Sequence, residues 1–344
     1  MYFAPRPNGA SATAMIAHCL SEGHIESPAR LESALESITK VQPDLRDSND
    51  IPLLSDFVND RLASDQDILL AHSAEFLAEF KRLENGEKIA EPKHFPNCGV
   101  NPVTTTYAAR AAAGSLLELL SMVGGQNDNS TTQSLLLRGL AVVRPPGHHC
   151  TREKSSGNGI LNNVAIAALT ASKKLNKRVL IVDLDIHLSG GTSDCIKGDD
   201  NILLVDVYGA RGQEIRTMAR LQGRSWQVRE SFDNTVAINV SLIDSSAGDH
   251  VYLGDQVLGE VLSAVNSHQP NLILFSIGFD SCAGDDEGFE FTANGYGQFI
   301  QTVCESAATN GIPVIGVLEG GYKPQIVEKG VRQVSLAMAS TITL

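Results

Sequence analysis

Two carboxylates and one imidazole alternate within residues 179–192, where Asp183, Asp185 and His187 occupy every second position. The stretch begins with the apolar run VLIV and ends in two glycines, which is typical of a strand that is buried on both faces and runs into a turn. Side chains two residues apart in a strand point to the same face, so these three would share one side of the strand end. Burying them is costly without a compensating group, and a divalent metal ion would compensate them.

A structural role is the alternative for the same residues. The two aspartates can cap a turn, with His187 as a hydrogen-bonded bystander. Because a short motif alone is only a hypothesis, this stretch by itself leaves both interpretations open.

The composition provides ample apolar material for a core, since 42% of the 344 residues are hydrophobic and 19% are charged. The formal net charge of -13 argues against a nucleic-acid partner, which would require a basic surface. The start of the chain does not resemble a secretory signal, and no apolar run has the length of a membrane span. The six cysteines form no CxxC pair. We therefore expect a cytoplasmic protein, also nuclear in a eukaryote, that binds neither nucleic acid nor membranes.

Hydrophobic patterning predicts strands that alternate with helices in the second half of the chain. Apolar runs predict strands at residues 140–143, 179–182, 201–207, 236–242, 271–277 and 312–318. Helical periodicity predicts helices at residues 28–38, 66–84, 104–123, 162–175, 252–265 and 295–308. This alternation implies an α/β fold with three α/β/α layers around a mostly parallel sheet. We expect one catalytic domain over residues 1–344.

Four of the predicted strands end in polar or glycine-rich sequence. These sequences are PPGHH at residues 145–149, DLDIH at 183–187, GFD at 278–280 and EGGY at 319–322. Ligands of open parallel sheets bind beyond the carboxyl ends of the strands. Each sequence alone is more often structural, but four of them at one sheet edge favour a functional site.

The residue types at this edge suggest metal chemistry. Asp185, His187 and Asp280 would supply two oxygens and one nitrogen, and catalytic zinc sites often use three protein ligands and leave a position for water. Such an ion makes the water more acidic and polarises a carbonyl group. Zinc is the favoured metal, and the same donors would also accept iron or manganese.

Further polar residues would complete a hydrolytic site around the metal. His148 and His149 would act as general base and acid, and Asp183 would orient one of them by fixing its tautomer. Tyr322 would donate a hydrogen bond to a developing oxyanion.

Five segments of the chain also carry a resemblance to a known family. They are VVRPPGHHC (142–150), SGNGILNNVAIAA (156–168), VLIVDLDIHLSGGT (179–192), LILFSIGFDS (272–281) and GVLEGGY (316–322). In this order they are similar to the motifs of the histone deacetylase superfamily, which includes class II deacetylases and acetylpolyamine amidohydrolases. The resemblance implies the arginase-deacetylase fold and hydrolysis of an acetylated amine.

By position, the resemblance implies roles for the residues named above. Asp185, His187 and Asp280 resemble the zinc ligands, His148 and His149 the tandem catalytic histidines, and Tyr322 the tyrosine that polarises the acetyl carbonyl.

A structural potassium site is implied by the same resemblance. It would use backbone oxygens around Asp183, Asp185 and His187, and Asp206 would add a side chain. Asp183 would therefore support both the first catalytic histidine and the monovalent cation.

The chain departs from the family pattern at three places. Gly190 stands where the family has the residue that orients the second histidine, so His149 would lack its partner. At the Gly157-Asn158 pair, which would bind substrate, Asn158 replaces the usual aromatic residue and gives the tunnel a polar wall. Asn97 aligns with the acidic residue that holds the substrate backbone in the family.

The favoured hypothesis is a zinc-dependent amidohydrolase that removes an acetyl group from an amine such as acetyl-lysine or an acetylpolyamine. The alternative is a deacetylase-like module that binds acylated ligands without turnover, motivated by Gly190 and Asn158. A phosphohydrolase is a weaker hypothesis, because the histidine pair would have no role in it. The sequence determines neither the physiological substrate nor the oligomeric state.

Overall fold

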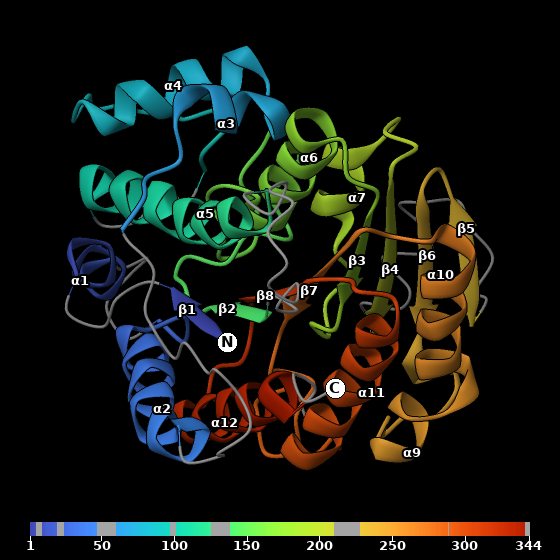
Figure 1. Ribbon diagram of the computed structural model, residues 1–344. Coiled ribbons are helices and arrows are strands. Elements are labelled where there is room, and N and C mark those ends of the chain that lie inside the picture. Colours follow the sequence, from blue (N-terminus) through green and yellow to red (C-terminus); the bar gives the residue numbers. More distant parts are fainter. Residues whose placement is uncertain are drawn as a thin grey trace, which may run out of the picture.

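An eight-stranded sheet forms the centre of the protein in the computed structural model, which describes residues 1–4, 9–18, 24–46, 60–96, 101–124, 138–209, 228–287 and 289–340. The strand order is β1-β2-β8-β7-β3-β4-β6-β5 (Figure 1). The strands are β1 (Tyr2–Ala4), β2 (Arg138–Ala141), β3 (Val179–Asp183), β4 (Ile202–Tyr208), β5 (Arg229–Phe232), β6 (Thr235–Asn239), β7 (Leu272–Ile277) and β8 (Val314–Leu318). Among the described residues, every strand pairing is parallel except that between β5 and β6.

The three central strands β8, β7 and β3 are buried along their whole length. Their sequences VIGVL, LILFSI and VLIVD are nearly continuous apolar runs, as expected for strands that are covered on both faces. The predicted α/β fold with a mostly parallel sheet is therefore confirmed.

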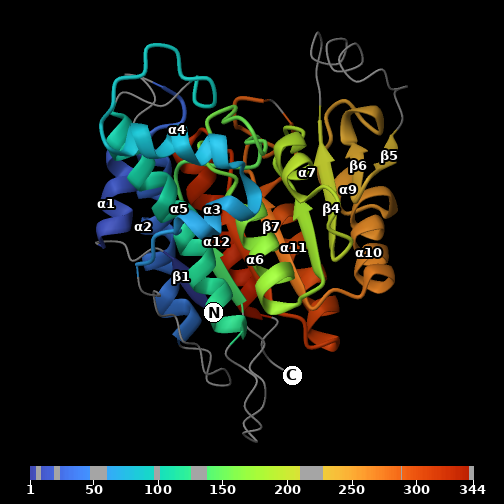
Figure 2. The same ribbon diagram turned by 90° about the horizontal axis from the view of Figure 1, so that it is seen from above.

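Helices cover both faces of the sheet (Figures 1 and 2). They are α1 (Ala10–Ala17), α2 (Pro28–Arg46), α3 (Asp65–Ala71), α4 (Ala74–Glu84), α5 (Pro102–Gly124), α6 (Asn163–Leu175), α7 (Gly190–Ile196), α9 (Asp249–Tyr252), α10 (Glu260–His268), α11 (Ala293–Thr309) and α12 (Pro324–Ser340). Helices α5 and α6 lie against the strands on one face, whereas α10 and α12 lie against them on the other. None of the helices in the described ranges is long and apolar enough to cross a membrane.

The single helix predicted at residues 66–84 is wrong, because the chain breaks there into α3 and α4. His72 turns into the interior, where its ring stacks on Phe76 with 4.2 Å between the centroids. Its Nε2 atom accepts a hydrogen bond of 3.0 Å from the backbone N–H of Asn162. Ser73 then caps α4 by accepting a hydrogen bond from the backbone N–H of Phe76.

Other element boundaries also differ from the prediction. The strand predicted at residues 236–242 ends at Asn239, whose side chain accepts a hydrogen bond from Ser241 N–H and starts the 3₁₀ helix Val240–Leu242. The helix predicted at 252–265 begins as the π-helix Asp255–Gly259 before it becomes α10. The sequence analysis did not predict β1, β5 or α12. The polar sequence GQNDNSTTQS at residues 125–134, which follows α5, lies outside the described residues.

Gly330 of α12 provides a test of the packing beneath the strand ends. A Cβ atom there would lie 2.4 Å from two ring carbons of Phe279, the buried residue that precedes Asp280. Alanine is favoured over glycine in a helix by about 1 kcal/mol, so overpacking has to outweigh this gain. We expect Gly330→Ala to lower the free energy of unfolding by about 1–3 kcal/mol in denaturant titrations. Lys329→Ala, at the exposed neighbouring position, should change it by less than about 0.5 kcal/mol, and equal values for the two variants would contradict the packing argument.

Candidate metal centre and active site

The loop after β3 brings three side chains together by successive tight turns. The strand ends at Asp183, so the extended geometry that would place the three side chains on one face does not persist to His187. Instead, Asp183 Oδ1 accepts a hydrogen bond of 3.1 Å from Asp185 N–H, and Asp185 Oδ1 accepts one of 3.0 Å from His187 N–H. Aspartate side chains commonly stabilise turns in this way. The two-residue spacing therefore has a role, but the turns and not strand alternation produce the convergence.

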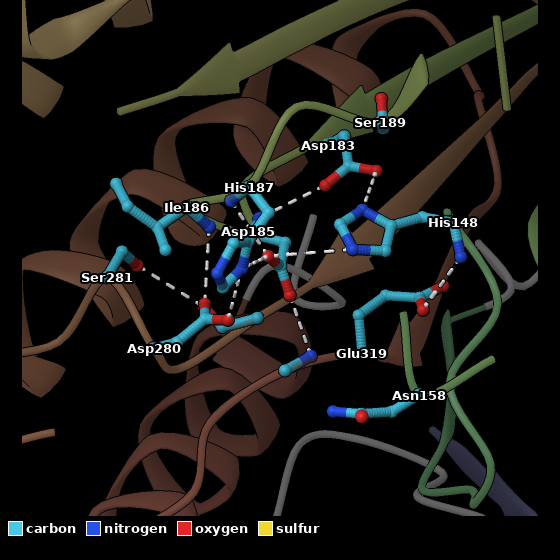
Figure 3. A network of polar contacts seen from close by, with 12 residues as sticks. His148, Asn158, Asp183, Asp185, Ile186, His187, Ser189, Asp280, Ser281 and Glu319 are labelled. Carbon is cyan, nitrogen blue, oxygen red and sulfur yellow. Dashed lines mark hydrogen bonds and ion pairs between the residues drawn. The ribbon is translucent and has the colours of Figure 1, made fainter. Parts of the chain in front are cut away.

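Asp185, His187 and Asp280 form a cluster that fits a metal ion (Figure 3). Each offers one ligand atom, and these atoms all lie within 4.8 Å of one another. His187 Nδ1 is 3.0 Å from Asp185 Oδ1 and 3.1 Å from Asp280 Oδ2. Asp280 follows β7, the strand that pairs with β3, so two neighbouring strands supply all three residues.

The electrostatics of this cluster favour a bound cation. Burial raises the pKa of Asp280, the charge of Asp185 raises it further, and the resulting value is about 6. Burial lowers the pKa of His187, but hydrogen bonds with Asp185 and Asp280 outweigh this effect and raise it. Two carboxylates at 1% exposure or less are thus held beside one imidazole. Two oxygens and one nitrogen are a donor set that zinc, iron and manganese accept.

The two predicted catalytic histidines lie beside the metal cluster. His148 Nδ1 is 3.2 Å from Asp183 Oδ2, and its Nε2 is 3.6 Å from Asp185 Oδ1. Burial lowers the pKa of His148, but the charges of Asp185 and Asp183 outweigh burial and raise it well above its ordinary value. Asp183 therefore lies within hydrogen-bond distance of His148, where it could fix the orientation of this ring.

His149 differs from His148 in its electrostatic environment. Its ring lies 4.2 Å from that of His148, and burial together with the charge of His148 lowers its pKa to about 3. A hydrogen bond with the backbone of Leu188 acts in the opposite direction. Gly190 has no side chain to orient His149, and a Cβ there would meet nothing within 4 Å, so the backbone of Leu188 stands as a partner in its place.

The loop after β8 closes the site over the metal cluster. Gly320 N–H donates a hydrogen bond of 2.7 Å to Asp185 Oδ2. A Cβ atom at Gly320 would lie 2.0 Å from Asp280 Oδ2, so this position excludes any side chain. Glu319 accepts a hydrogen bond of 2.6 Å from Gly147 N–H and one of 3.2 Å from His148 N–H, which connects this loop to the histidine pair.

Tyr322 is held on several sides. Asp285 Oδ2 accepts hydrogen bonds of 2.9 Å from the backbone N–H groups of Tyr322 and Lys323. The Arg30 guanidinium lies 5.4 Å from the centroid of the Tyr322 ring and donates to the backbone oxygen of Gly321. Burial, followed by the charges of Asp280 and Asp185, raises the pKa of Tyr322, so its hydroxyl stays protonated.

The two predicted substrate-binding residues lie between His149 and Tyr322. Gly157 has φ of +58°, and a Cβ atom there would lie 2.5 Å from Cδ2 of His149. Asn158 Nδ2 is 3.4 Å from the hydroxyl of Tyr322. The structure thus places both residues at the site, whereas Asn97 lies outside the described residues.

The predicted monovalent cation site contains buried polar atoms that lack hydrogen-bond partners. Asp206 faces Asp183 across the β3–β4 pairing, and its Oδ2 accepts a hydrogen bond of 3.0 Å from Ser189 N–H. Asp206 Oδ1 and Ser189 Oγ are buried and have no hydrogen-bond partner among the described residues. Burial and the charge of Asp183 raise the pKa of Asp206 to about 8. A cation beside these oxygens would compensate both carboxylates.

Four residues with contacts to this site were missed as functional candidates: Arg30, Asp285, Glu287 and Glu319. Glu287 Oε1 lies 3.6 Å from Nε2 of His187. The helical spacing could have revealed Arg30, because it lies four residues before Ala34 and therefore on the buried face of α2, where a charged residue is unusual. No sequence pattern distinguishes Asp285 and Glu287 from surface residues, because an acidic run after a strand is usually exposed to solvent.

Comparison with known proteins identifies the family. Residues 24–338 match the histone deacetylase domain, which is most of the chain. The chain belongs to the histone deacetylase family. It is 28% identical over 307 residues to histone deacetylase 6 of Caenorhabditis elegans and 30% identical over 315 residues to polyamine deacetylase HDAC10 of Homo sapiens, in both cases over 88% of the chain.

These relatives are longer proteins, since the matches cover only 30% of the worm deacetylase and 42% of the human one. A crystal structure of the HDA15 HD domain aligns with a TM-score of 0.76 at 22% identity, over 99% of this chain and 89% of that one. At this identity the match supports the deacetylase fold alone. The family expected from the sequence motifs is therefore confirmed.

Removal of one ligand tests the metal site. We expect the purified protein to bind a divalent ion and Asp280→Ala to weaken that binding by more than about 100-fold, because changes in outer-shell residues alone cost 10–100-fold. Competition with a chromogenic zinc chelator would measure this. Asp200→Ala removes an exposed carboxylate and should leave the affinity unchanged. Equal affinities of the Asp280→Ala protein and the parent would exclude the site.

Proposed function

We propose that the protein is a zinc-dependent deacetylase that hydrolyses the amide bond of an acetylated amine. The observation that carries this proposal is the buried Asp185–His187–Asp280 cluster, flanked by a histidine pair and by a protonated tyrosine. The names of the relatives, histone deacetylase and polyamine deacetylase, support the same reaction type.

The zinc ion would be held by Asp185, His187 and Asp280, and when bound it makes water more nucleophilic and polarises the acyl carbonyl. The base and acid roles are the reverse of the order expected from the sequence. His149 would be the base, because burial and the charge of His148 lower its pKa and keep the ring neutral, with a nitrogen free to take a proton from water. His148 holds its proton because of Asp183 and Asp185, and it can donate this proton to the leaving amine.

Tyr322 would stabilise the oxyanion that develops on the acyl oxygen. Its hydroxyl is protonated because burial raises its pKa, so it can donate a hydrogen bond to negative charge. Arg30 and Asp285 hold the peptide group before the tyrosine, and Asp285 also holds the backbone N–H of Lys323 after it. Such preorganisation avoids the cost of orienting the donor during the reaction.

The contact between His149 and Leu188 bears on the alternative of a binding module without turnover. That alternative was motivated by the missing side chain at Gly190 and by the polar Asn158, and only the first of these is addressed by this contact. Because the Leu188 backbone contacts His149, the tautomer of this histidine can be fixed without a side chain at residue 190. We therefore favour the enzyme over the binding module.

The exposed side of the metal cluster favours a cationic substrate. Glu287 is 39% exposed and lies beside His187, the most exposed member of the cluster at 29%. The adjacent acid Asp286 is paired with Lys323 at 2.6 Å. Together with the net charge of -13, a carboxylate at this position would attract a second ammonium group of the substrate. We infer that an acetylated polyamine suits the site better than a neutral amide does.

A potassium ion would complete the site as a structural cofactor. Asp206 and Asp183 would provide carboxylate oxygens, and backbone oxygens around Asp185 and His187 would add to them. The buried, unpaired Oδ1 of Asp206 supports this proposal.

The histidine pair gives the first test of the proposed reaction. We expect turnover of acetyl-lysine peptides or acetylpolyamines that stops when a chelator is added. His149→Ala should lower kcat by about 10²–10⁴-fold, because a proton-transfer group is lost. Gly190→Ala, which adds a methyl group to open space, should keep kcat within about twofold. Turnover that survives the chelator or Asp185→Ala would exclude the proposal.

The substrate class has its own test at Glu287. We expect Glu287→Gln to raise KM for an acetylated polyamine by about 10-fold with kcat unchanged, since one charge-assisted contact is worth 1.5–3 kcal/mol. A neutral acetylated alkylamine should show no change. Asp286→Asn removes the same charge from the adjacent residue and should leave both KM values near those of the parent. Zinc content is measured in parallel, because Glu287 also lies beside His187 and its loss could weaken metal binding instead of substrate binding. Equal effects on the neutral and cationic substrates would contradict a contact between Glu287 and the ammonium group.

A further inference from the structure

Asn158 lies next to the tyrosine that the proposed mechanism uses. Its Nδ2 atom is 3.4 Å from the Tyr322 hydroxyl oxygen, and this hydrogen bond joins two residues 164 positions apart in the chain. In the view of Figure 3, Asn158 lies on the side of Glu319. The amide nitrogen of asparagine only donates hydrogen bonds, so the phenol oxygen is the acceptor.

The backbone on both sides of Asn158 packs closely against the histidine segment. Gly157 packs on the ring of His149, and a Cβ atom there would lie only 2.5 Å from Cδ2. A Cβ atom at Gly159 would lie 2.6 Å from Cys150 Sγ and 2.8 Å from the backbone oxygen of Pro146. Glycines on both sides therefore let the loop pack directly against the histidine segment. Asn158 is held between this segment and the β8 loop.

The direction of this hydrogen bond matters for the chemistry. A phenol that accepts a hydrogen bond from Asn158 can turn its own proton only toward other acceptors, such as the acyl oxygen of a substrate. Hydrogen bonds in such a chain polarise one another, so accepting one makes the hydroxyl a stronger donor. Burial and the nearby carboxylates Asp280 and Asp185 act in the opposite sense, because they raise the pKa of Tyr322.

We propose that Asn158 is a positioning residue that orients and polarises the Tyr322 hydroxyl as the oxyanion donor. This inference rests on the proposed deacetylase reaction. It assigns Asn158 a role different from the polar tunnel wall that the sequence suggested. A polar wall would change KM selectively among substrates, whereas an orienting residue changes kcat for all of them and acts only through Tyr322.

A double-mutant cycle separates these roles. Asn158→Leu keeps the approximate volume and removes the donor, and we expect it to lower kcat about 10-fold on both acetyl-lysine peptides and acetylpolyamines, with KM within about twofold. In the Tyr322→Phe background the same substitution should change kcat by less than about twofold, because the acceptor is already absent. Ser156→Ala, at an exposed position of the same loop, is the control and should keep the parent kcat.

Two outcomes would overturn the inference while leaving the deacetylase function intact. One is an equal loss of kcat in both backgrounds, and the other is a change in KM confined to one substrate. If the parent protein turns over no acylated amine, the proposed function fails, and the same variants are compared for binding of a short hydroxamic acid. Its carbonyl oxygen then stands in for that of the substrate. Coupled losses of affinity would support the Asn158–Tyr322 pair, and additive losses would exclude it.

Discussion

The structure depends on holding Asp185 and Asp280 close together in a buried position. Two like charges without compensation are costly in such surroundings, and the raised pKa of Asp280 reflects this cost. Three features of the chain reduce it: the imidazole of His187, the backbone N–H of Gly320 and the backbone N–H of Ile186, which donates to Asp280. A divalent cation would supply the remaining compensation.

The parallel sheet makes this arrangement feasible. Strands β2, β8, β7 and β3 are consecutive neighbours, so the four polar loops that follow them meet at one edge. Each loop is joined to another by a hydrogen bond from a backbone N–H group to a buried carboxylate. Glu319 connects the β8 loop to the histidine pair, Asp185 connects the β3 loop to Gly320, and Asp285 connects the β7 loop to Tyr322. A change in one loop would therefore displace groups in the others.

Much of the fold and of the site was predictable, because burial on both faces leaves a clear signal in strands such as β3 and β7. The cluster of Asp185, His187 and Asp280 followed from the positions of strand ends, and their catalytic roles stay predictions. The predictions that were wrong concern local structure that depends on tertiary contacts. The break at His72 and the turns after Asp183 arise from side-chain hydrogen bonds that no periodicity encodes. The contact of His149 with Leu188 uses a backbone group. Every residue carries such a group, so the sequence does not indicate which one would contact His149.

The metal coordination is the central claim, and zinc-edge X-ray absorption of the purified protein tests it most directly. The account predicts one nitrogen donor and oxygen donors at about 2.0–2.2 Å, with no sulfur near 2.3 Å. The outer-shell scattering of one imidazole ring, which identifies the nitrogen donor, should disappear when His187 is replaced by alanine. A spectrum dominated by sulfur, or an unchanged spectrum in the His187→Ala protein, would contradict it.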